Sequence, residues 1–259
     1  MGKTYEAIIR AEQEIKDSAK EKNIDKDFMP LADADLKIQA VKCHTHKMTS
    51  AAEIVSQKLY TTMTTLNDKS HNKLISVVFS GVKSKAGAST ISINTAKAFC
   101  ENSNSKVLLI DGNLRTPALH YYFGIKNANG LTDIVNGKIA SKEALYGENK
   151  NVFYFIPSGT KVDNPTTFFL SEAFSKFHNE LKKYFSFIIY DSGPILTSPE
   201  TAFLAKKACG LVLVVEAGVT KWEVAKVAKK QLEDNNVNIL GAILNKKKYY
   251  IPSFFYNKI

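Results

Sequence analysis

One short segment carries residues whose types and spacing suit phosphate. Gly87, Ala88, Ser89 and Thr90 follow an apolar, β-branched run and open a stretch with helical spacing. Backbone N–H groups at a helix N-terminus are unpaired donors at the positive end of the helix dipole, so they favour an anion. The hydroxyl of Ser89 stands where a loop of this kind offers a ligand to magnesium. The segment therefore predicts a phosphate-binding loop.

Three other apolar runs end in polar residues that could contact a nucleotide or its magnesium ion: Asp111 with Asn113 and Arg115 close behind it, Asp191, and Asn245. Two carboxylates and a hydroxyl, from Asp111, Asp191 and Ser89, can hold a magnesium ion together with water and phosphate oxygens. The side-chain amide of Asn245 suits the edge of a base. A single aspartate in such a place is more simply explained as a residue that ends a strand. Four polar segments in this order favour a nucleotide site.

The elements that must position these residues alternate along the chain. Apolar runs predict strands at 74–80, 106–111, 151–159, 185–191, 210–218 and 239–245. Helical spacing predicts helices at 91–102, 166–185, 198–208 and 221–236. Such alternation is typical of a doubly wound α/β fold, with a mostly parallel sheet and helices on both faces. Right-handed crossovers then place the four polar segments on one edge, at the carboxyl ends of the strands.

Length and composition indicate one cytoplasmic α/β protein. The 259 residues divide into an expected helical arm and linker (1–47), the α/β domain (48–246) and a basic aromatic tail (247–259). The chain is 44% hydrophobic and has no apolar run of membrane-spanning length. Its N-terminal segment is polar, unlike a secretory signal. Three well-separated cysteines favour a reducing compartment over a disulfide framework.

The net charge of +10 predicts an anionic partner: a nucleotide, nucleic acid, phospholipid or acidic protein. Part of this charge lies in the segment 245–259, which has four lysines and no acid. A simple solvated end explains such a segment equally well.

The motifs, taken in order, resemble the bacterial tyrosine kinases of the exopolysaccharide co-polymerase type, which are relatives of the MinD/ParA class of P-loop ATPases. The similarity extends over about residues 50–245. It rests on four segments, DGNLRTPALHYYFGIKNANGLTDIVNG, IPSGTKVDNPTTFFLSEAF, IIYDSGPIL and LGAILNK.

This resemblance implies a P-loop NTPase fold with ATP or ADP and Mg²⁺ as ligands. It also implies a membrane-embedded polysaccharide co-polymerase as partner, with assembly into a homo-oligomer as a further option, and no nucleic acid. The location it implies is cytoplasmic, at the inner face of the plasma membrane through that partner.

The chain departs from the family pattern at three positions of the predicted nucleotide site. Ala88 occupies the place of the P-loop lysine, and Lys85 occupies the place of an upstream loop glycine. Asn113 replaces the second aspartate of the family's second motif. Losing one preorganised charge contact in phosphoryl transfer costs about 3–4 kcal/mol at the transition state. These departures predict a degenerate kinase-like protein that regulates exopolysaccharide or capsule synthesis through binding and assembly.

An active ATP-dependent tyrosine autokinase is the first alternative. Lys83 falls where the MinD/ParA class has a second lysine, and either Lys83 or Lys85 could reach the phosphates because lysine is a flexible point charge. Asp111 and Asp191 would then be catalytic. The family phosphorylates a C-terminal tyrosine cluster, and this chain has three candidate acceptors: Tyr249, Tyr250 and Tyr256.

A MinD/ParA-like positioning ATPase is the second alternative. Such a protein would bind membrane or DNA through its basic surface. The segment DNPTTFFL and the tyrosines of the tail are features of the kinase family and favour the kinase-like interpretation.

Overall fold

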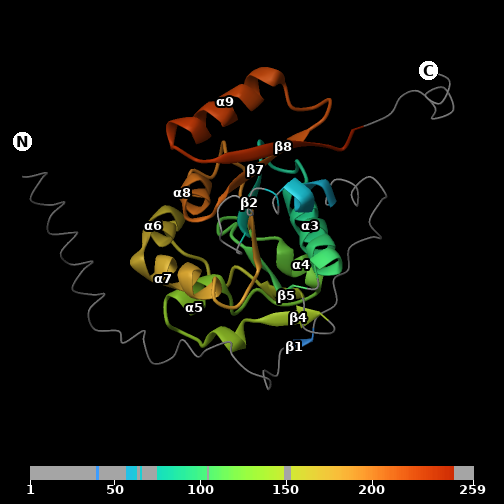
Figure 1. The fold of residues 1–259 in the computed structure, drawn as a ribbon. Helices are drawn as coiled ribbons and strands as arrows, with labels where there is room; N and C mark the ends of the chain where they lie inside the picture. The colour runs from blue at the N-terminus through green and yellow to red at the C-terminus, as the bar shows by residue number, and fades with distance from the viewer. Residues whose placement is uncertain are drawn as a thin grey trace, which may run out of the picture.

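The computed structural model describes residues 39–40, 57–62, 65, 75–103, 105–148 and 153–247. The predicted helical arm lies outside these residues apart from a two-residue strand, and the predicted tail lies outside them apart from Lys247. The domain boundaries therefore stay predictions. The described chain forms one central sheet, with α3 on one side and α6, α7 and α8 on the other (Figure 1).

The sheet has eight described strands in the order β1-β4-β5-β3-β6-β2-β7-β8. Their bounds are β1 (Gln39–Ala40), β2 (Ile75–Gly81), β3 (Val107–Asp111), β4 (Tyr146–Glu148), β5 (Phe153–Ile156), β6 (Phe187–Ser192), β7 (Gly210–Glu216) and β8 (Ile239–Asn245). All neighbours pair in parallel except β4 with β5. The predicted mostly parallel, doubly wound sheet is confirmed.

The central strands are buried on both faces, and this explains their unbroken apolar sequence. Every residue of β3, β5 and β6 is buried. Successive residues enter opposite hydrophobic clusters: Val78, Leu108 and Ile188 on the side of α6 and α7, and Val77, Leu109 and Ile189 on the side of α3. The two-sided core fixes the register of the strands, and with it the positions of the residues that follow them.

The described helices are α3 (Ala88–Ser103), α4 (Leu119–Phe123), α5 (Leu131–Val135), α6 (Pro165–Leu170), α7 (Glu172–Leu181), α8 (Glu200–Lys207) and α9 (Trp222–Asp234), with a 3₁₀ turn η1 (Ser141–Glu143). The predicted single helix 166–185 is wrong, because it is two helices. Ser171 has extended backbone angles (φ −62°, ψ 150°), ends α6 and caps α7 by accepting the Phe174 N–H. A serine that caps a new helix competes with continuation of the old one.

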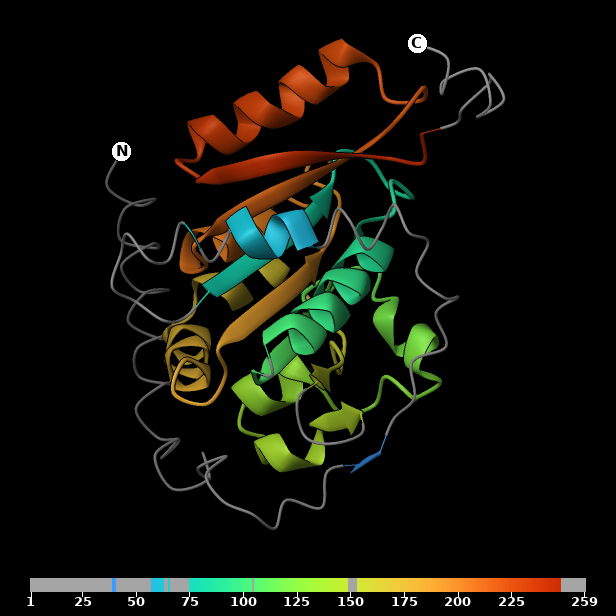
Figure 2. The same cartoon turned by 45° about the vertical axis from the view of Figure 1, so that its right-hand side comes forward.

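Two short helices, α4 and α5, and the strand β4 fill the long connection between β3 and β5, where alternation alone predicted no element. At the opposite edge of the sheet, α9 lies outermost, over β8 (Figure 2). No helix in the described ranges combines the length and the apolar character needed to span a membrane.

Candidate functional site

Parallel pairing brings the predicted site residues to one edge of the sheet. Asp111 and Asp191 are register partners on β3 and β6. The loop from β2 to α3 starts next to them, since Ser80 of β2 is the register partner of Ser192. Asn245 ends β8 at the same edge and contacts that loop. The structure therefore brings together the four segments that the sequence singled out.

The loop between β2 and α3 keeps the backbone of a glycine-rich loop. Lys85 and Gly87 both have left-handed backbones, with φ of 64° and 95°. A Cβ added to Gly87 would lie 2.2 Å from the side-chain nitrogen of Asn245, so a glycine is required there. The left-handed region costs a side-chain-bearing residue about 1–2 kcal/mol. Lys85 thus has a backbone conformation that a glycine would adopt without steric cost.

The end of β8 holds this loop in place. The Asn245 side chain donates to the Ala86 carbonyl (2.8 Å), and Lys246 Nζ donates to the Lys85 carbonyl (2.6 Å). Lys246 also pairs with Glu216 at 3.1 Å. The first N–H groups of α3, at Ala88 and the residues after it, have no partner within the helix by its geometry. The loop carbonyls are thereby bound by β8, and the helix terminus remains suited to phosphate.

Asp191 is almost fully buried, and one of its oxygens has no partner. Its Oδ1 accepts from Ser92 Oγ at 3.2 Å, and Oδ2 has no hydrogen-bond partner among the described residues. Burial raises the pKa of Asp191 to about 8, with a further rise from the Asp111 charge, while the nearby hydroxyls of Ser89 and Ser92 lower it. A buried carboxylate with an open oxygen favours a proton or a cation beside it.

Asp111 organises the loop that follows β3. It is fully buried and accepts the backbone N–H groups of Leu119 (3.0 Å), Asn113 (3.1 Å) and Ala118 (3.1 Å). Burial raises the pKa of Asp111 to about 7, and these three hydrogen bonds oppose the rise. The carboxylate therefore both shapes the loop and adds a second buried negative charge next to Asp191.

This pair fits a magnesium ion that shares its coordination with a nucleotide. The described residues contain no group of three or more His, Cys, Asp or Glu side chains able to enclose a metal. Asp111, Asp191 and the half-buried Ser89 could supply oxygen ligands, leaving positions for water and phosphate, as Mg²⁺ prefers. The open oxygen of Asp191 is the observation that supports this fit.

Two residues predicted to bind nucleotide are held by other protein groups. Asn113 exchanges hydrogen bonds with Thr116, donating to its carbonyl (2.8 Å) and accepting its N–H (3.2 Å). Arg115 makes a bidentate ion pair with Glu200, with Nε–Oε1 at 2.7 Å and Nη2–Oε2 at 3.1 Å. The Glu200 side chain is only 3% exposed. Sequence analysis missed Glu200, because it lies 85 residues from Arg115 along the chain.

The remaining predicted residues divide into exposed and undescribed ones. Lys83 and Lys85 are exposed, and no ion pair joins either of them to another residue in the described part of the chain. Thr90 is exposed in the first turn of α3. The candidate acceptors Tyr249, Tyr250 and Tyr256 lie outside the described residues.

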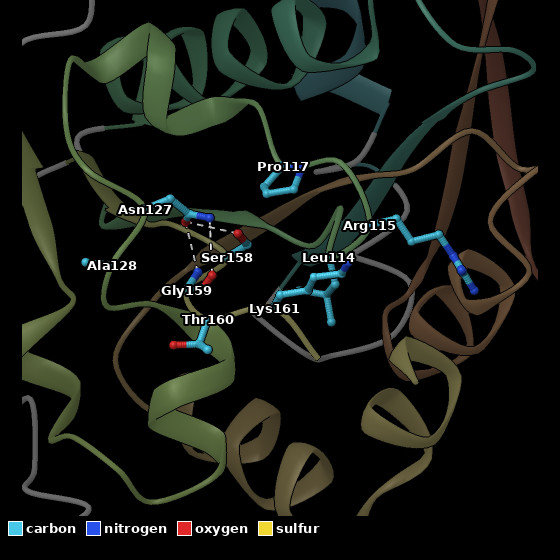
Figure 3. Close-up of a pocket in the computed structure, with 9 residues that line it drawn as sticks. All are labelled: Leu114, Arg115, Pro117, Asn127, Ala128, Ser158, Gly159, Thr160 and Lys161. Atoms are coloured by element: carbon cyan, nitrogen blue, oxygen red, sulfur yellow. Dashed lines mark hydrogen bonds between the residues drawn. The ribbon is translucent and has the colours of Figure 1, made fainter. Parts of the chain in front are cut away.

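A pocket of about 440 Å³ lies next along the edge, at the carboxyl ends of β3 and β5 (Figure 3). Asn127 fixes one wall: its Oδ1 accepts from Ser158 Oγ and from the Gly159 N–H (both 3.0 Å), and its Nδ2 donates to the Gly159 carbonyl (3.2 Å). Leu114, Pro117 and Lys161 are among the other lining residues. Sequence analysis missed this pocket, because its walls come from separate loops.

The fold is that of solved P-loop domains of the MinD/ParA type. The MinD protein of Pyrococcus horikoshii, solved with Mg-ADP, matches with a TM-score of 0.53 and 20% identity over 71% of this chain and 76% of that one. The kinase domain of Escherichia coli tyrosine kinase ETK matches with a TM-score of 0.68 and 23% identity, covering 78% and 79% of the two chains. The chimerical protein CapA2B2 matches with a TM-score of 0.70 and 22% identity, covering 81% and 96%.

Sequence relatives narrow this class to one family. The chain is 31% identical to the putative tyrosine-protein kinase CapB of Staphylococcus aureus, covering 71% of this chain and 81% of CapB. It is also 31% identical to tyrosine-protein kinase YwqD of Bacillus subtilis, covering 78% and 85%, and to CpsD of Streptococcus pneumoniae, covering 78% and 91%. No protein-family model matches. On the strength of these relatives, the chain belongs to the bacterial tyrosine-protein kinase family, and the resemblance inferred from its motifs is confirmed.

The buried aspartate pair makes stability depend on pH. The raised pKa values mean that the folded state binds more protons than the unfolded state between about pH 4 and 8, so stability falls as pH rises through this window. Asp191→Asn should raise the melting temperature at pH 8 by about 2–4 °C for each kcal/mol of relief. It should change it little at pH 4. Thermal unfolding in magnesium-free buffer at both pH values measures the difference.

Asp163→Asn is the matched control, because Asp163 is an exposed aspartate outside the site. It should not alter the pH dependence. An Asp191→Asn variant that is less stable than the wild type at pH 8 would contradict a destabilising buried charge.

The ion pair between Arg115 and Glu200 should be visible as coupling. Arg115→Ala leaves a buried carboxylate unpaired and should cost about 1–3 kcal/mol, at the lower end of such losses because the arginine is 45% exposed. The double variant Arg115→Ala/Glu200→Gln should lose less than the sum of the two single variants. Urea unfolding of the four proteins gives the coupling energy. Simple additivity would show that the pair contributes nothing to stability.

Proposed function

We propose that this protein is a kinase-like regulator of exopolysaccharide or capsule synthesis that binds a magnesium nucleotide and transfers phosphate very slowly. One observation carries the proposal. The loop before α3 retains its phosphate-binding backbone and the aspartate pair retains an open oxygen, yet Ala88 offers no cation. Binding groups are thus present in a site that lacks charge needed for transfer.

The groups that would bind are mostly backbone and carboxylate. N–H groups from Gly87 to Thr90 would contact phosphate oxygens, and Asn245 lies at the β8 end, where a base would lie. Ser89, Asp111 and Asp191 would hold Mg²⁺, which supplies charge neutralisation when bound. These contacts need no P-loop lysine, so affinity for the ground state can survive its loss.

Transfer would suffer more than binding. Ala88 contributes only a backbone N–H where the family has an ammonium group, and Asn113 is neutral and bound to Thr116. Arg115 is bound to Glu200, so its guanidinium is not a ready replacement. Each missing charge contact costs about 3–4 kcal/mol at the transition state. Two such losses together would reduce the rate of phosphate transfer by several orders of magnitude. Nucleotide binding could still change the conformation of the protein.

The relatives support a proposal for the partner and the location. The relatives of this chain include tyrosine-protein kinases named CpsD, CapB and EpsB. The match to the CapA2B2 chimera supports a second polypeptide as a companion. The companion we propose is a membrane-embedded polysaccharide co-polymerase. The protein would work in the cytoplasm at the inner face of the plasma membrane, alone or as a homo-oligomer, and without nucleic acid.

An active autokinase is the second candidate, and two features favour it. Lys83 and Lys85 are exposed within the loop and could supply the missing cation. The pocket lined by Leu114 and Arg115, in the loop that follows Asp111, could admit an acceptor tyrosine. The candidate acceptors are Tyr249, Tyr250 and Tyr256. A MinD/ParA-like positioning role has only the shared fold in its support.

Calorimetric titration with ADP and ATP, with and without Mg²⁺, tests the binding step. The wild type should bind both nucleotides in a magnesium-dependent way, and Asp191→Asn should remove the magnesium dependence because an open carboxylate oxygen is lost. Lys83→Ala should bind like the wild type. A large loss of affinity in Lys83→Ala would favour the autokinase, and no binding at millimolar nucleotide would refute the proposal.

Lys85→Gly separates the backbone role of Lys85 from its charge. The glycine removes the left-handed strain and should raise the free energy of unfolding by about 1 kcal/mol. If the ammonium group is not needed, nucleotide affinity stays unchanged; urea unfolding and titration of the same sample report both quantities. A variant that is more stable but no longer binds nucleotide would assign the cation to Lys85.

Restoring the missing charges should restore transfer. Ala88→Lys combined with Asn113→Asp returns one cation and one carboxylate, so phosphorylation of the tail tyrosines should rise by about 100-fold or more. Incorporation of labelled phosphate from ATP measures this rise. Ala88→Met, a long side chain without charge, is the control. A wild-type protein that already phosphorylates its tail as fast as the restored variant would show that the site is not degenerate.

A further inference from the structure

Exposed apolar side chains gather on the last helix–strand unit of the described chain. Among the described residues, six large hydrophobic side chains are exposed, and four of them belong to this unit: Val219 (62% exposed), Trp222 (70%), Val227 (59%) and Leu244 (61%). The helix α9 buries only Ala228 and Leu232. Large apolar side chains clustered on one outer element mark a contact surface more often than scattered ones do.

Three of these side chains, Val219, Trp222 and Leu244, lie at the same edge of the sheet. The loop that carries Val219 and the start of α9 follow the carboxyl end of β7, and Leu244 is next to the last residue of β8. Leu244 is the register partner of Val215, which packs against the core on the same side as α9. Figure 2 shows α9 as the outermost helix at this end of the sheet.

Lysines accompany the exposed apolar residues along α9. Trp222, Lys226 and Lys230 are all exposed and follow each other at intervals of four residues, which places them on one helix face. Lys226 Nζ lies 5.8 Å from the centre of the Trp222 ring. We call Val219, Lys221, Trp222, Lys226, Val227, Lys230 and Leu244 the α9 surface.

The charge of this region is positive over the first half of the helix. Between residues 221 and 230 there are four lysines and one acid, Glu223. Lys229 and Glu233 form an ion pair at 3.3 Å, so their charges neutralise each other. The three lysines of the α9 surface therefore outnumber the nearby free acid.

The sequence beyond β8 has the same composition. Residues 248–259 contain five aromatic residues, two lysines and no acid, and they follow the strand that carries Leu244. Aromatic rings and lysines together are typical of the boundary between water and lipid, where the ring enters the headgroup region and the ammonium group stays with anionic headgroups. The composition of α9 and the composition of residues 248–259 thus favour the same kind of partner.

We propose that the α9 surface is a docking face for an anionic lipid surface. Trp222 and the exposed aliphatic side chains would enter the headgroup region, and Lys221, Lys226 and Lys230 would bind lipid phosphates. The exposed face of one helix is convex, which suits a flat, fluid surface. This contact needs no nucleotide, so it can hold even if the proposed nucleotide binding fails.

Co-sedimentation of the full chain with vesicles tests the proposal. The probes are vesicles of phosphatidylcholine with phosphatidylglycerol and vesicles of phosphatidylcholine alone. Binding should require phosphatidylglycerol and fall with salt. Trp222→Ala and Lys226→Glu should each weaken it about five-fold or more. Tyr121→Ala, which removes an aromatic residue 75% exposed outside the α9 surface, and Lys161→Glu are matched controls that should not change it.

Four results would overturn the proposal. Equal binding to neutral and anionic vesicles would exclude charge recognition, and an equal loss in the control variants would exclude the α9 surface. If a chain shortened after Lys247 loses all binding while Trp222→Ala has no effect, the tail alone would be responsible. A Trp222→Ala effect on the sedimentation coefficient without lipid, and none on vesicle binding, would instead make this surface a contact between copies.

Discussion

The geometry of the candidate site depends on two carboxylates that the sheet places side by side. Parallel pairing of β3 with β6 makes Asp111 and Asp191 register partners, and helices on both faces bury them. Each negative charge then raises the cost of the other, so the pair needs a compensating charge or a proton. The three N–H groups on Asp111 and the serine hydroxyl on Asp191 compensate in part. The remaining oxygen of Asp191 leaves a place for a cation.

The loop between β2 and α3, which the sequence predicts to bind phosphate, is the other half of this arrangement. Gly87 is fixed by the close approach of Asn245, and Lys85 accepts a left-handed backbone that a glycine would adopt freely. Lys246 and Asn245 bind the loop carbonyls from β8. The conformation of the loop is therefore set by contacts with its neighbours and does not depend on the side chain at Ala88.

The sequence allowed the sheet and its polar edge to be predicted, because buried parallel strands have continuous apolar runs and end in recognisable residues such as Asp111 and Asp191. It did not allow the break at Ser171 to be predicted, since helical spacing continues through that residue and only its capping bond to Phe174 divides the helix. The partners of Arg115 and Asn127 were equally hidden. Glu200 is 85 residues from Arg115, and no local pattern states such a contact.

The balance between cost and retained geometry is the strongest argument about function. A buried carboxylate pair destabilises the folded protein at neutral pH unless a ligand compensates, and neutral side chains of similar size would remove that cost. The same holds for the strained backbone of Lys85, which a glycine would relieve. Both costs lie where the site is proposed to bind a magnesium nucleotide, and a cation beside Asp191 would offset the first of them.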